Sequence, residues 1–352
     1  MLVTILLPKA LFADDPAPAV IIWMVRILVT GASGFVGSLL SGALLGEGHA
    51  VRAFGRDLER IEMALDAAAA GRASRRAATA EATAELAAGD AVSGAGLAEA
   101  LDGADVAYYL IHSMERSGGR DSFAELERRA AGNFGEAAAA AGVKRIVYLG
   151  GLVPRWSAAE AGAAASRHLA SRLEVERLLL EAVPASLALR ASIVIGARSR
   201  SFRLLVRLVE RMRVVPLPSW QRFRTQPIDA RDVIAMLVAA ADLDGPRGSL
   251  DIAGPEILTY GEMVRRIADL MLIDRPALNL GVSIGSVTGR IAAAIAGEDP
   301  ELVTALMGSL KGDLLAQGEN AGEALNVHLH RFDTAVEHAL AEWETNERLA
   351  AW

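Results

Sequence analysis

The sequence of 352 residues contains no cysteine, and this absence removes several classes of protein from consideration. Disulfide scaffolds, cysteine-ligated zinc sites, iron–sulfur clusters and thiol nucleophiles all require cysteine. An excess of basic residues is also missing, because 36 lysines and arginines face 43 aspartates and glutamates and leave a net charge of −7. Nucleic-acid binders use basic blocks to neutralise phosphates. We therefore expect no nucleic-acid partner.

Long apolar runs are absent as well. The mean hydropathy of +0.30 is carried by alanine, whereas a membrane-spanning helix needs about 20 apolar residues in a row. The best window, Ala277–Gly297, is interrupted by Arg290 and by several glycines and serines. We expect no membrane span. A chain without cysteine fits the reducing cytoplasm, and this is the location that we predict.

The first 23 residues differ in character from the rest. Their apolar run starts at Leu2, without the basic region that opens a secretion signal. The stretch Ala13–Ala19 is rich in proline and aspartate and has the composition of a linker. Met24 then opens a β-branched strand without a spacer. We predict that residues 1–23 form a disordered extension and that the folded chain begins at Met24.

Between residues 24 and 196, short apolar strands alternate with helical segments. Strands are expected at Val25–Thr30, Ala50–Phe54, Ala84–Ala88, Val106–Ile111, Arg145–Leu149 and Ser186–Ile195. Helices are expected at Ser38–Glu47, Leu58–Ala70, Gly96–Leu101, Phe123–Ala141 and Arg167–Ala182. Short apolar strands that are each followed by a helix are typical of a parallel sheet covered on both faces. The pattern predicts an α/β fold with a doubly wound parallel sheet, the Rossmann fold.

After Gly196 this alternation stops and helices dominate. Further elements are expected as helices at Phe202–Arg213, Asp229–Ala241 and Thr259–Met271, and as a strand at Leu250–Ala253. Thr259 and Glu262 have the spacing of a capping box, in which each side chain binds the other residue's backbone N–H. We therefore divide the folded chain into a Rossmann domain, residues 24–196, and a smaller helix-rich C-terminal lobe, residues 197–352.

A glycine-rich turn joins the first strand to the first helix. In Thr30–Gly37 (TGASGFVG), Gly31 suits a tight turn, Gly34 lets the backbone approach a pyrophosphate, and Gly37 lets the helix pack close to the strand. Free N–H groups at the start of the helix can hold phosphates. We predict dinucleotide contacts from Gly31, Ser33, Gly34, Phe35, Val36 and Gly37. The alternative is a glycine-rich turn without a ligand.

The GxxGxxG spacing and the TGASGFVG wording resemble the extended and atypical short-chain dehydrogenase/reductases. Further segments share the resemblance: AYYLIHSM at Ala107–Met114, RIVYLGGL at Arg145–Leu152, LRASIVIG at Leu189–Gly196, QPIDARDV at Gln226–Val233 and GPEILTY at Gly254–Tyr260. Together they are similar to the NmrA-like and NAD-dependent epimerase/dehydratase-like proteins, from Met24 to about residue 345. The resemblance implies an NAD(P)-binding Rossmann domain and a C-terminal lobe that shapes the substrate cleft. It implies no particular substrate.

The end of the second strand bears on the choice between NAD and NADP. NAD-binding proteins usually carry a carboxylate there, which binds the ribose 2′-hydroxyl. This chain has Arg56 instead, followed by Arg60 one helical turn later, and a guanidinium can pair with a 2′-phosphate. We therefore favour NADP(H) over NAD(H) as the cofactor. The alternative is that Arg56 is a solvated charge and Asp57 binds the ribose.

Further cofactor contacts are expected at the ends of later strands. By the resemblance, Asp90 contacts the adenine edge; the alternative is a role in a turn or helix cap. Leu110, Ile111, His112 and Ser113 end the fourth strand at the edge that faces the cofactor, so that His112 and Ser113 would lie near the nicotinamide ribose. A purely structural His112 is the alternative. Gly150 and Gly151 end the fifth strand at the same edge.

The catalytic position departs from the superfamily pattern. The reductases that the chain resembles place Tyr and Lys four residues apart on the helix after the fifth strand, and a Ser at the end of that strand. Here Gly150 and Gly151 replace the Ser, and His168 and Arg172 occupy the two helix positions. His168 could deliver a proton and Arg172 could hold the ribose hydroxyls. The alternative is a surface His168 and a packing Arg172.

Two functions of different classes follow, with a third in reserve. The first is an NADP(H)-dependent oxidoreductase that acts on a small organic carbonyl or alkene without the usual Tyr-Lys pair. The second is a non-catalytic dinucleotide sensor of the NmrA type, and the third is a sugar-nucleotide epimerase or dehydratase. No metal site is expected, because His328 and His330 have no third ligand at metal spacing. Exposed alanine-rich helices leave a homodimer open.

One basic segment stands outside this scheme. Arg203, Arg207, Arg211 and Arg213 follow one another at helical spacing, close to Trp220. We expect a solvated helix face, and the alternative is a surface that collects an anionic ligand or an acidic partner.

Overall fold

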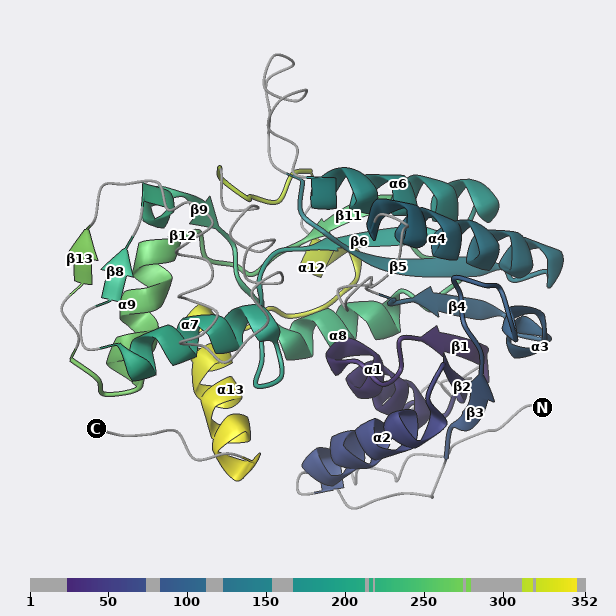
Figure 1. The fold of residues 1–352 in the computed structure, drawn as a ribbon, viewed down its shortest axis with the longest axis horizontal. Coiled ribbons are helices and arrows are strands. Elements are labelled where there is room, and N and C mark those ends of the chain that lie inside the picture. The colour runs from purple at the N-terminus through teal and green to yellow at the C-terminus, as the bar shows by residue number, and fades with distance from the viewer. Residues whose placement is uncertain are drawn as a thin grey trace, which may run out of the picture.

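The computed structural model describes residues 24–73, 83–111, 123–153, 167–212, 215–217, 219–274, 277–279, 312–318 and 321–346. Its centre is a parallel seven-stranded sheet with the strand order β11-β6-β5-β4-β1-β2-β3. The strands are β1 (Arg26–Thr30), β2 (Ala50–Gly55), β3 (Glu85–Ala88), β4 (Val106–Tyr109), β5 (Arg145–Gly151), β6 (Leu187–Ala191) and β11 (Gly248–Ile252). This order, with crossovers through helices, confirms the predicted doubly wound Rossmann fold (Figure 1).

Helices cover both faces of the sheet (Figure 1). The helices that alternate with the strands are α1 (Phe35–Gly46), α2 (Leu58–Ala73), α3 (Leu97–Leu101), α4 (Phe123–Ala140) and α6 (Arg167–Ala182). Along β1, the side chains of Ile27 and Val29 join the core beneath α1, whereas Leu28 joins the core beneath α3, α4 and α6. The alternation of side chains along a strand thus supplies two separate apolar cores.

The chain returns to this sheet after residue 196. Helix α8 (Ala230–Ala239) packs against α1, and β11 forms the edge of the sheet beside β6. The hydroxyl of Tyr108 in β4 donates a 2.6 Å hydrogen bond to the carbonyl of Leu237 in α8. Part of the segment expected to form the C-terminal lobe therefore completes the Rossmann layer.

Arg145 also ties the sheet to α8. Its buried guanidinium donates hydrogen bonds to the carbonyls of Ala240, Asp242 and Gly245, at and just beyond the end of that helix. These carbonyls have no partner within the helix, so a cation at this end satisfies them and favours the helix dipole.

A third apolar core lies at the other end of the molecule, between α7 (Arg200–Arg211), α9 (Tyr260–Leu270) and α13 (Phe332–Asn346) (Figure 1). Short strand pairs lie outside the seven-stranded sheet. They are β7 (Val194–Ile195) with β10 (Ile228–Asp229), β9 (Arg224–Thr225) with β12 (Leu258–Thr259), and β8 (Val215–Leu217) with β13 (Ala277–Asn279). The 3-10 helix η1 (Ser219–Arg222) and the short helix α12 (Ala321–Ala324) complete the described elements.

The basic segment on α7 is a structural element of this third core. Arg207 is only 5% exposed and pairs with Glu210 at 2.5 Å. The guanidinium groups of Arg203 and Arg207 lie 4.5 and 4.9 Å from the ring centre of Trp343 in α13. The expectation of a solvated face is wrong for these two residues, because Trp343 offers an aromatic surface that stabilises cations. Arg211 is exposed as expected, and Arg213 lies outside the described residues.

Two sequence expectations differ from the structure in their boundaries. The first helix begins at Phe35 and not at Ser38, because Gly34 already has the extended backbone of an N-cap residue. The strand expected at Ser186–Ile195 is divided into β6 and β7, since β6 pairs with β5 and β11 whereas Val194 pairs with Ile228. The predicted capping box of Thr259 and Glu262 is confirmed.

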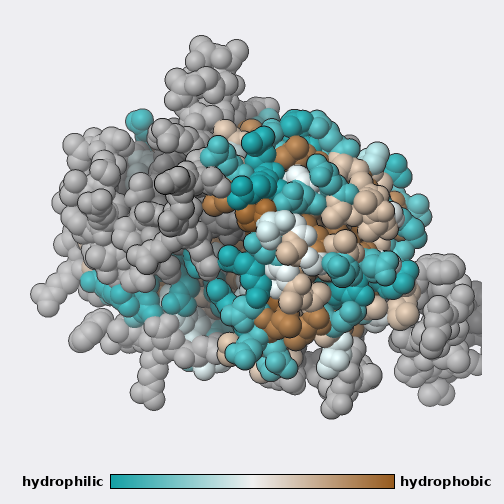
Figure 2. All heavy atoms as spheres, turned by 45° about the vertical axis from the view of Figure 1, so that its right-hand side comes forward, coloured by the Kyte–Doolittle hydropathy of each residue, from teal (hydrophilic) through white to brown (hydrophobic). Residues whose placement is uncertain are grey.

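Other expectations concern the surface and the beginning of the chain. Residues 1–23 lie outside the described part. In the part of the chain that is described, no helix combines the length and the apolar character needed to cross a membrane. On the face that Figure 2 shows, hydrophilic residues are interspersed with apolar ones in the coloured part of the surface. The homodimer stays a prediction.

Candidate cofactor site

The glycine turn has the geometry that its sequence predicts. Gly31 adopts a φ of +66°, a left-handed conformation that favours glycine, and a Cβ atom there would lie 2.6 Å from the carbonyl oxygen of Leu110. A Cβ at Gly37 would collide with the backbone of Gly31. These two glycines let α1 begin directly above the end of β1 and beside the end of β4, as a phosphate-binding turn requires.

The first turn of α1 is open at this edge. Its N-cap residue is Gly34, which has no side chain to cap the helix, and the first turn contains no acidic residue. In any α-helix the first amide N–H groups, here those of Phe35, Val36 and Gly37, have no acceptor within the helix. Ser33, just before the N-cap, is half-buried. A phosphate group fits the donors and the dipole of such a helix end.

The ends of β1 and β4 are tied together beneath this turn. The hydroxyl of Thr30 donates to the carbonyl of Tyr108 at 2.9 Å and accepts from the N–H of Leu110 at 3.2 Å. Leu110 is buried against Gly31, and Ile111 is half-buried at the same edge. The structure therefore brings both residues to the glycine turn. His112 and Ser113 lie outside the described residues, so their cofactor roles stay predictions.

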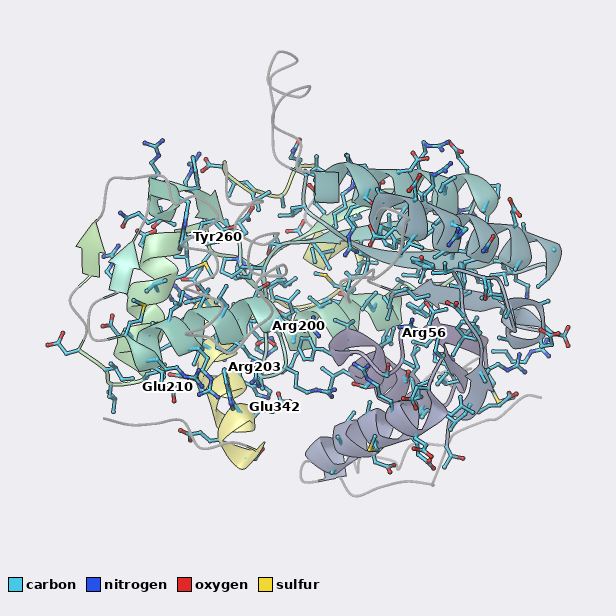
Figure 3. The ribbon with its side chains drawn as sticks, in the orientation of Figure 1. Arg56, Arg200, Arg203, Glu210, Tyr260 and Glu342 are labelled. Atoms are coloured by element: carbon cyan, nitrogen blue, oxygen red, sulfur yellow. The ribbon has the colours of Figure 1, made fainter. Side chains whose placement is uncertain are left out.

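Arg56 follows β2 directly and is exposed (Figure 3). Arg60, one turn along α2, is exposed as well. Asp57 caps α2, because its Oδ1 accepts a 3.0 Å hydrogen bond from the N–H of Arg60. The alternative that gave Asp57 to the ribose would need this carboxylate to serve both the helix and the cofactor. Arg56 lies at the end of the strand, where the sequence predicts a 2′-phosphate, and this contact stays a prediction.

Asp90 has the contacts of a turn residue. Its Oδ1 accepts a 3.1 Å hydrogen bond from the N–H of Val92, and its backbone forms a bridge with Ala95. These are the contacts of the structural alternative, and the adenine contact stays a prediction.

Gly150 and Gly151 lie at the carboxyl end of β5. A Cβ at Gly150 would lie 2.9 Å from the ring of Tyr148, whereas Gly151 is exposed with open space around its Cα. A larger residue at Gly150 would press on the buried Tyr148 ring. Their contact with the cofactor stays a prediction.

The candidate catalytic pair lies on α6, as its spacing predicts. Arg172 is 9% exposed, and its guanidinium lies 3.8 Å from Oε1 of Glu127 in α4. The hydroxyl of Ser171 donates a 2.6 Å hydrogen bond to the same carboxylate. Arg172 therefore lies at the interface between α4 and α6. These contacts are the ones expected if Arg172 is a packing residue and not a cofactor ligand. The side chain of His168 lies outside the described residues, and the catalytic role of either residue stays a prediction.

All four tyrosines of the chain are poor acid–base groups. Burial raises the pKa of Tyr108 and Tyr109, and it raises the pKa of Tyr260 to about 12. Burial also raises the pKa of Tyr148, although the nearby Arg172 opposes the shift. Each phenol therefore keeps its proton near neutral pH, and none matches the tyrosine whose pKa the reductases lower with a lysine.

Sequence reasoning missed one contact at the glycine turn. The loop after β7 brings Arg198 to the first turn of α1, where its Nη1 donates a 3.2 Å hydrogen bond to Oγ of Ser38. The two residues are 160 positions apart, so no local spacing could indicate this contact.

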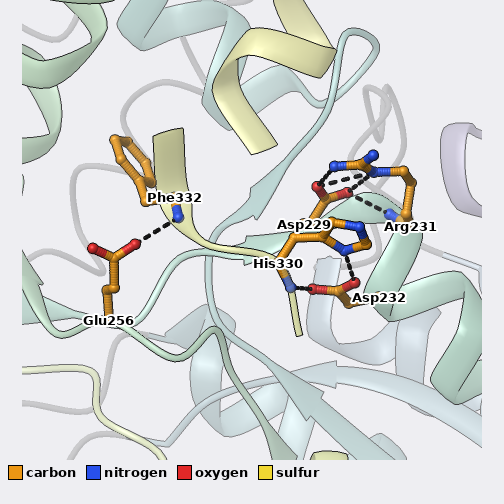
Figure 4. A network of polar contacts seen from close by, with 6 residues as sticks. All are labelled: Asp229, Arg231, Asp232, Glu256, His330 and Phe332. Atoms are coloured by element: carbon orange, nitrogen blue, oxygen red, sulfur yellow. Dashed lines mark hydrogen bonds and ion pairs between the residues drawn. The ribbon is translucent and has the colours of Figure 1, made fainter. Parts of the chain in front are cut away.

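It also missed two carboxylates that hold the segment leading into α13 (Figure 4). Asp232 accepts hydrogen bonds from the backbone N–H and from Nδ1 of His330, at 2.8 and 2.5 Å. Glu256 accepts a 2.7 Å hydrogen bond from the N–H of Phe332. His330, weighed above with His328 as a metal ligand, therefore contacts a carboxylate on α8. Within the described ranges, no group of three acidic or histidine side chains could bind a metal ion.

Comparison with known proteins adds a family and a set of similar folds. The model of the NmrA-like family matches residues 24–246. A search of curated proteins finds no significant match. Among solved structures, the protein gox2253 is 22% identical, with a TM-score of 0.65, over 91% of this chain and 98% of its own.

Two further structures carry nicotinamide cofactors. Bordetella bronchiseptica WbmG in complex with NAD and UDP is 16% identical, with a TM-score of 0.67, over 92% of this chain and 96% of its own. Citrobacter sp. triphenylmethane reductase in complex with NADP(H) is 15% identical, with a TM-score of 0.65, over 89% and 99%. At these identities the similarity demonstrates a shared fold.

Proposed function

Since the chain belongs to the NmrA-like family, we propose that it is an NADP(H)-dependent oxidoreductase that acts on a small organic carbonyl or alkene. One observation carries the proposal: α1 begins at the uncapped Gly34, beside Leu110 at the carboxyl edge of the sheet. This is where Rossmann proteins hold the diphosphate of a dinucleotide. Triphenylmethane reductase, which has the same fold and binds NADP(H), supports an oxidoreductase.

The described residues divide the work of cofactor binding. The amides at the start of α1 would hold the diphosphate, and Arg56 would pair with the 2′-phosphate that distinguishes NADP from NAD. The bound cofactor supplies hydride transfer at the nicotinamide C4. Burial raises the pKa of all four tyrosines and makes each phenol a weak acid, so the proton for the substrate would come from His168 or from water. The cleft would contribute orientation of the substrate.

Gly34 offers a test that separates cofactor binding from folding. Its backbone, with φ −78° and ψ 170°, is open to any residue, and a Cβ would lie 3.0 Å from the Gly31 oxygen. Aspartate is a preferred N-cap residue, so Gly34→Asp should preserve the melting temperature. Its carboxylate would repel a diphosphate, and we expect the Kd for NADPH to rise at least about tenfold, as loss of a charge-assisted contact does.

Gly34→Asn is the matched control, because asparagine caps a helix equally well and has no charge. We expect a smaller loss of NADPH affinity in this variant than in Gly34→Asp. Undiminished binding of NADPH by Gly34→Asp would contradict the site, and a wild-type protein that binds neither NADPH nor NADH would contradict the function.

Catalysis needs its own experiment. We expect NADPH oxidation with at least one member of a panel of carbonyls, quinones and activated alkenes, followed by the absorbance of NADPH. His168→Ala should reduce the rate more than the affinity for NADPH, if His168 delivers the proton. Arg172→Ala tests a contact with the ribose, but it also removes the cation beside the buried Glu127, which keeps its hydrogen bond from Ser171.

A second candidate is a dinucleotide sensor without catalytic activity. The observation in its favour is the contact of Arg172 with Glu127, which holds this cation between α4 and α6 at the position where reductases carry their lysine. Tight NADPH binding, together with no turnover across the panel, would support the sensor over the oxidoreductase.

A further inference from the structure

The loop after β7 is seated on the glycine turn. Gly196 packs so closely on Phe35 that a Cβ at residue 196 would lie 2.6 Å from the Phe35 ring and 3.0 Å from the Cβ of Ala230. The absence of a side chain at Gly196 therefore brings the loop against the first turn of α1. Two residues later, Arg198 donates its 3.2 Å hydrogen bond to Ser38. Ser199 then forms the N-cap of α7.

The first turn of α1 is an unfavourable place for the Arg198 guanidinium when no anion is bound there. The N-terminal end of a helix carries about half a positive charge. The first turn of α1 has no acidic residue to neutralise it. Arg198 is exposed, so its guanidinium is not enclosed by the protein. An anion at the start of α1 would turn this repulsion into attraction, because both the amides and the guanidinium would donate to it.

We propose that Arg198 is a ligand of the cofactor diphosphate, which it holds against the first turn of α1. This inference rests on the proposed function, because a dinucleotide on the glycine turn is what brings a diphosphate to this place. Arg198 and Arg56 then have separate tasks. The diphosphate is common to NAD and NADP, so Arg198 sets the affinity for both, whereas Arg56 discriminates between them through the 2′-phosphate.

The test compares Arg198→Ala and Arg198→Lys with Arg211→Ala. Arg211 is the matched control, since it is an exposed arginine at the opposite end of α7. Binding of NADPH, NADH and ADP-ribose is measured by calorimetry; ADP-ribose retains the diphosphate and lacks both the nicotinamide and the 2′-phosphate. We expect Arg198→Ala to raise all three Kd values by about 10- to 100-fold, Arg198→Lys to raise them less, and Arg211→Ala to change none.

The melting temperature without ligand supplies the second measurement. Loss of a cation beside the positive end of α1 should leave the melting temperature of Arg198→Ala unchanged or higher. A lower melting temperature together with unchanged Kd values would make Arg198 a structural residue and overturn the inference. A loss confined to NADPH would assign Arg198 to the 2′-phosphate and also overturn it. In both cases the wild type still binds the dinucleotides, so the proposed function stands; if the wild type binds none of them, both fall.

Discussion

Asp232 on α8 holds His330, which lies 98 positions later in the sequence, through two hydrogen bonds. One carboxylate oxygen accepts from the backbone N–H of His330 at 2.8 Å, and the other lies 2.5 Å from Nδ1 of its ring. The Asp232 side chain is only 1% exposed, whereas that of His330 is 36% exposed. This pair joins the helix that packs on the Rossmann layer to the segment that enters α13.

The pair predicts a pH-dependent contribution to stability. Burial raises the pKa of Asp232 above its ordinary value of 3.8, while the hydrogen bonds from His330 oppose the shift. A carboxyl group with a raised pKa in the folded state stabilises the fold below that ordinary value, and this contribution is lost as the pH rises through the raised pKa. The free energy of unfolding of the wild type should therefore fall relative to that of Asp232→Asn as the pH rises from 3.8.

Urea unfolding of both proteins between about pH 3.5 and pH 7 would measure the difference, provided that unfolding is two-state. A parallel pH dependence in the two proteins would contradict the raised pKa. His330→Ala, which removes the opposing side-chain hydrogen bond, should move the loss to a higher pH.

The position of Arg56 at the end of β2 predicts a preference for NADPH over NADH. Loss of a charge-assisted hydrogen bond from Arg56→Ala should weaken NADPH binding by roughly 1–3 kcal/mol and leave NADH binding unaffected. Calorimetric titration with the two cofactors measures both values. Arg60→Ala, a nearby loss of the same charge, is the control for a general electrostatic effect. Equal losses for NADPH and NADH would contradict a contact with the 2′-phosphate.

The left-handed backbone of Leu272 predicts that a substitution by glycine stabilises the fold. Leu272 follows Met271, the C-cap residue of α9, has a φ of +57° and is 93% exposed. The N–H groups of Leu272 and Ile273 bind the carbonyls of Asp269 and Ala268, so Leu272 occupies the position where helices usually have glycine. Leu272→Gly removes the strain of the left-handed backbone and should raise the free energy of unfolding by about 0.5–1 kcal/mol.

Asn326 is the matched control for this substitution. It lies two residues after the end of α12 and has a φ of +52°, and asparagine tolerates that backbone better than leucine does. Asn326→Gly should therefore change the stability less than Leu272→Gly. Denaturant unfolding measures the free energy of unfolding of both variants. A destabilised Leu272→Gly protein would show that the leucine side chain stabilises the fold by more than its left-handed backbone destabilises it.

The hydrogen bond between Tyr108 and α8 predicts a measurable contribution to the free energy of unfolding. Tyr108→Phe leaves the ring in the core and removes the 2.6 Å hydrogen bond to Leu237. The loss of one buried hydrogen bond should lower the free energy of unfolding by about 0.5–1.5 kcal/mol. A fall in melting temperature by calorimetry would show it, whereas an unchanged value would mean that water replaces the hydroxyl.

Features that depend on neighbouring residues could be read from the chain. Gly31 and Gly37 are required by a turn that joins adjacent elements, and Thr259 caps a helix three residues before Glu262. The alternation of strands and helices likewise follows from local apolar patterns, and it led to the correct fold. Local physics is sufficient here because the interacting groups are close together along the backbone.

Contacts between residues that are distant in the sequence could not be predicted from it and are seen only in the folded structure. The spacing of Arg207 indicated a solvated face, but α13 brings Trp343 against it. The i, i+4 position of Arg172 suited a ribose, but α4 presents Glu127 to it. Arg198 reaches Ser38 across 160 positions because Gly196 leaves room for Phe35. The sequence determined which charged and polar side chains are present. The tertiary structure decided which partner each charge contacts, because the partner comes from another element that packs against it.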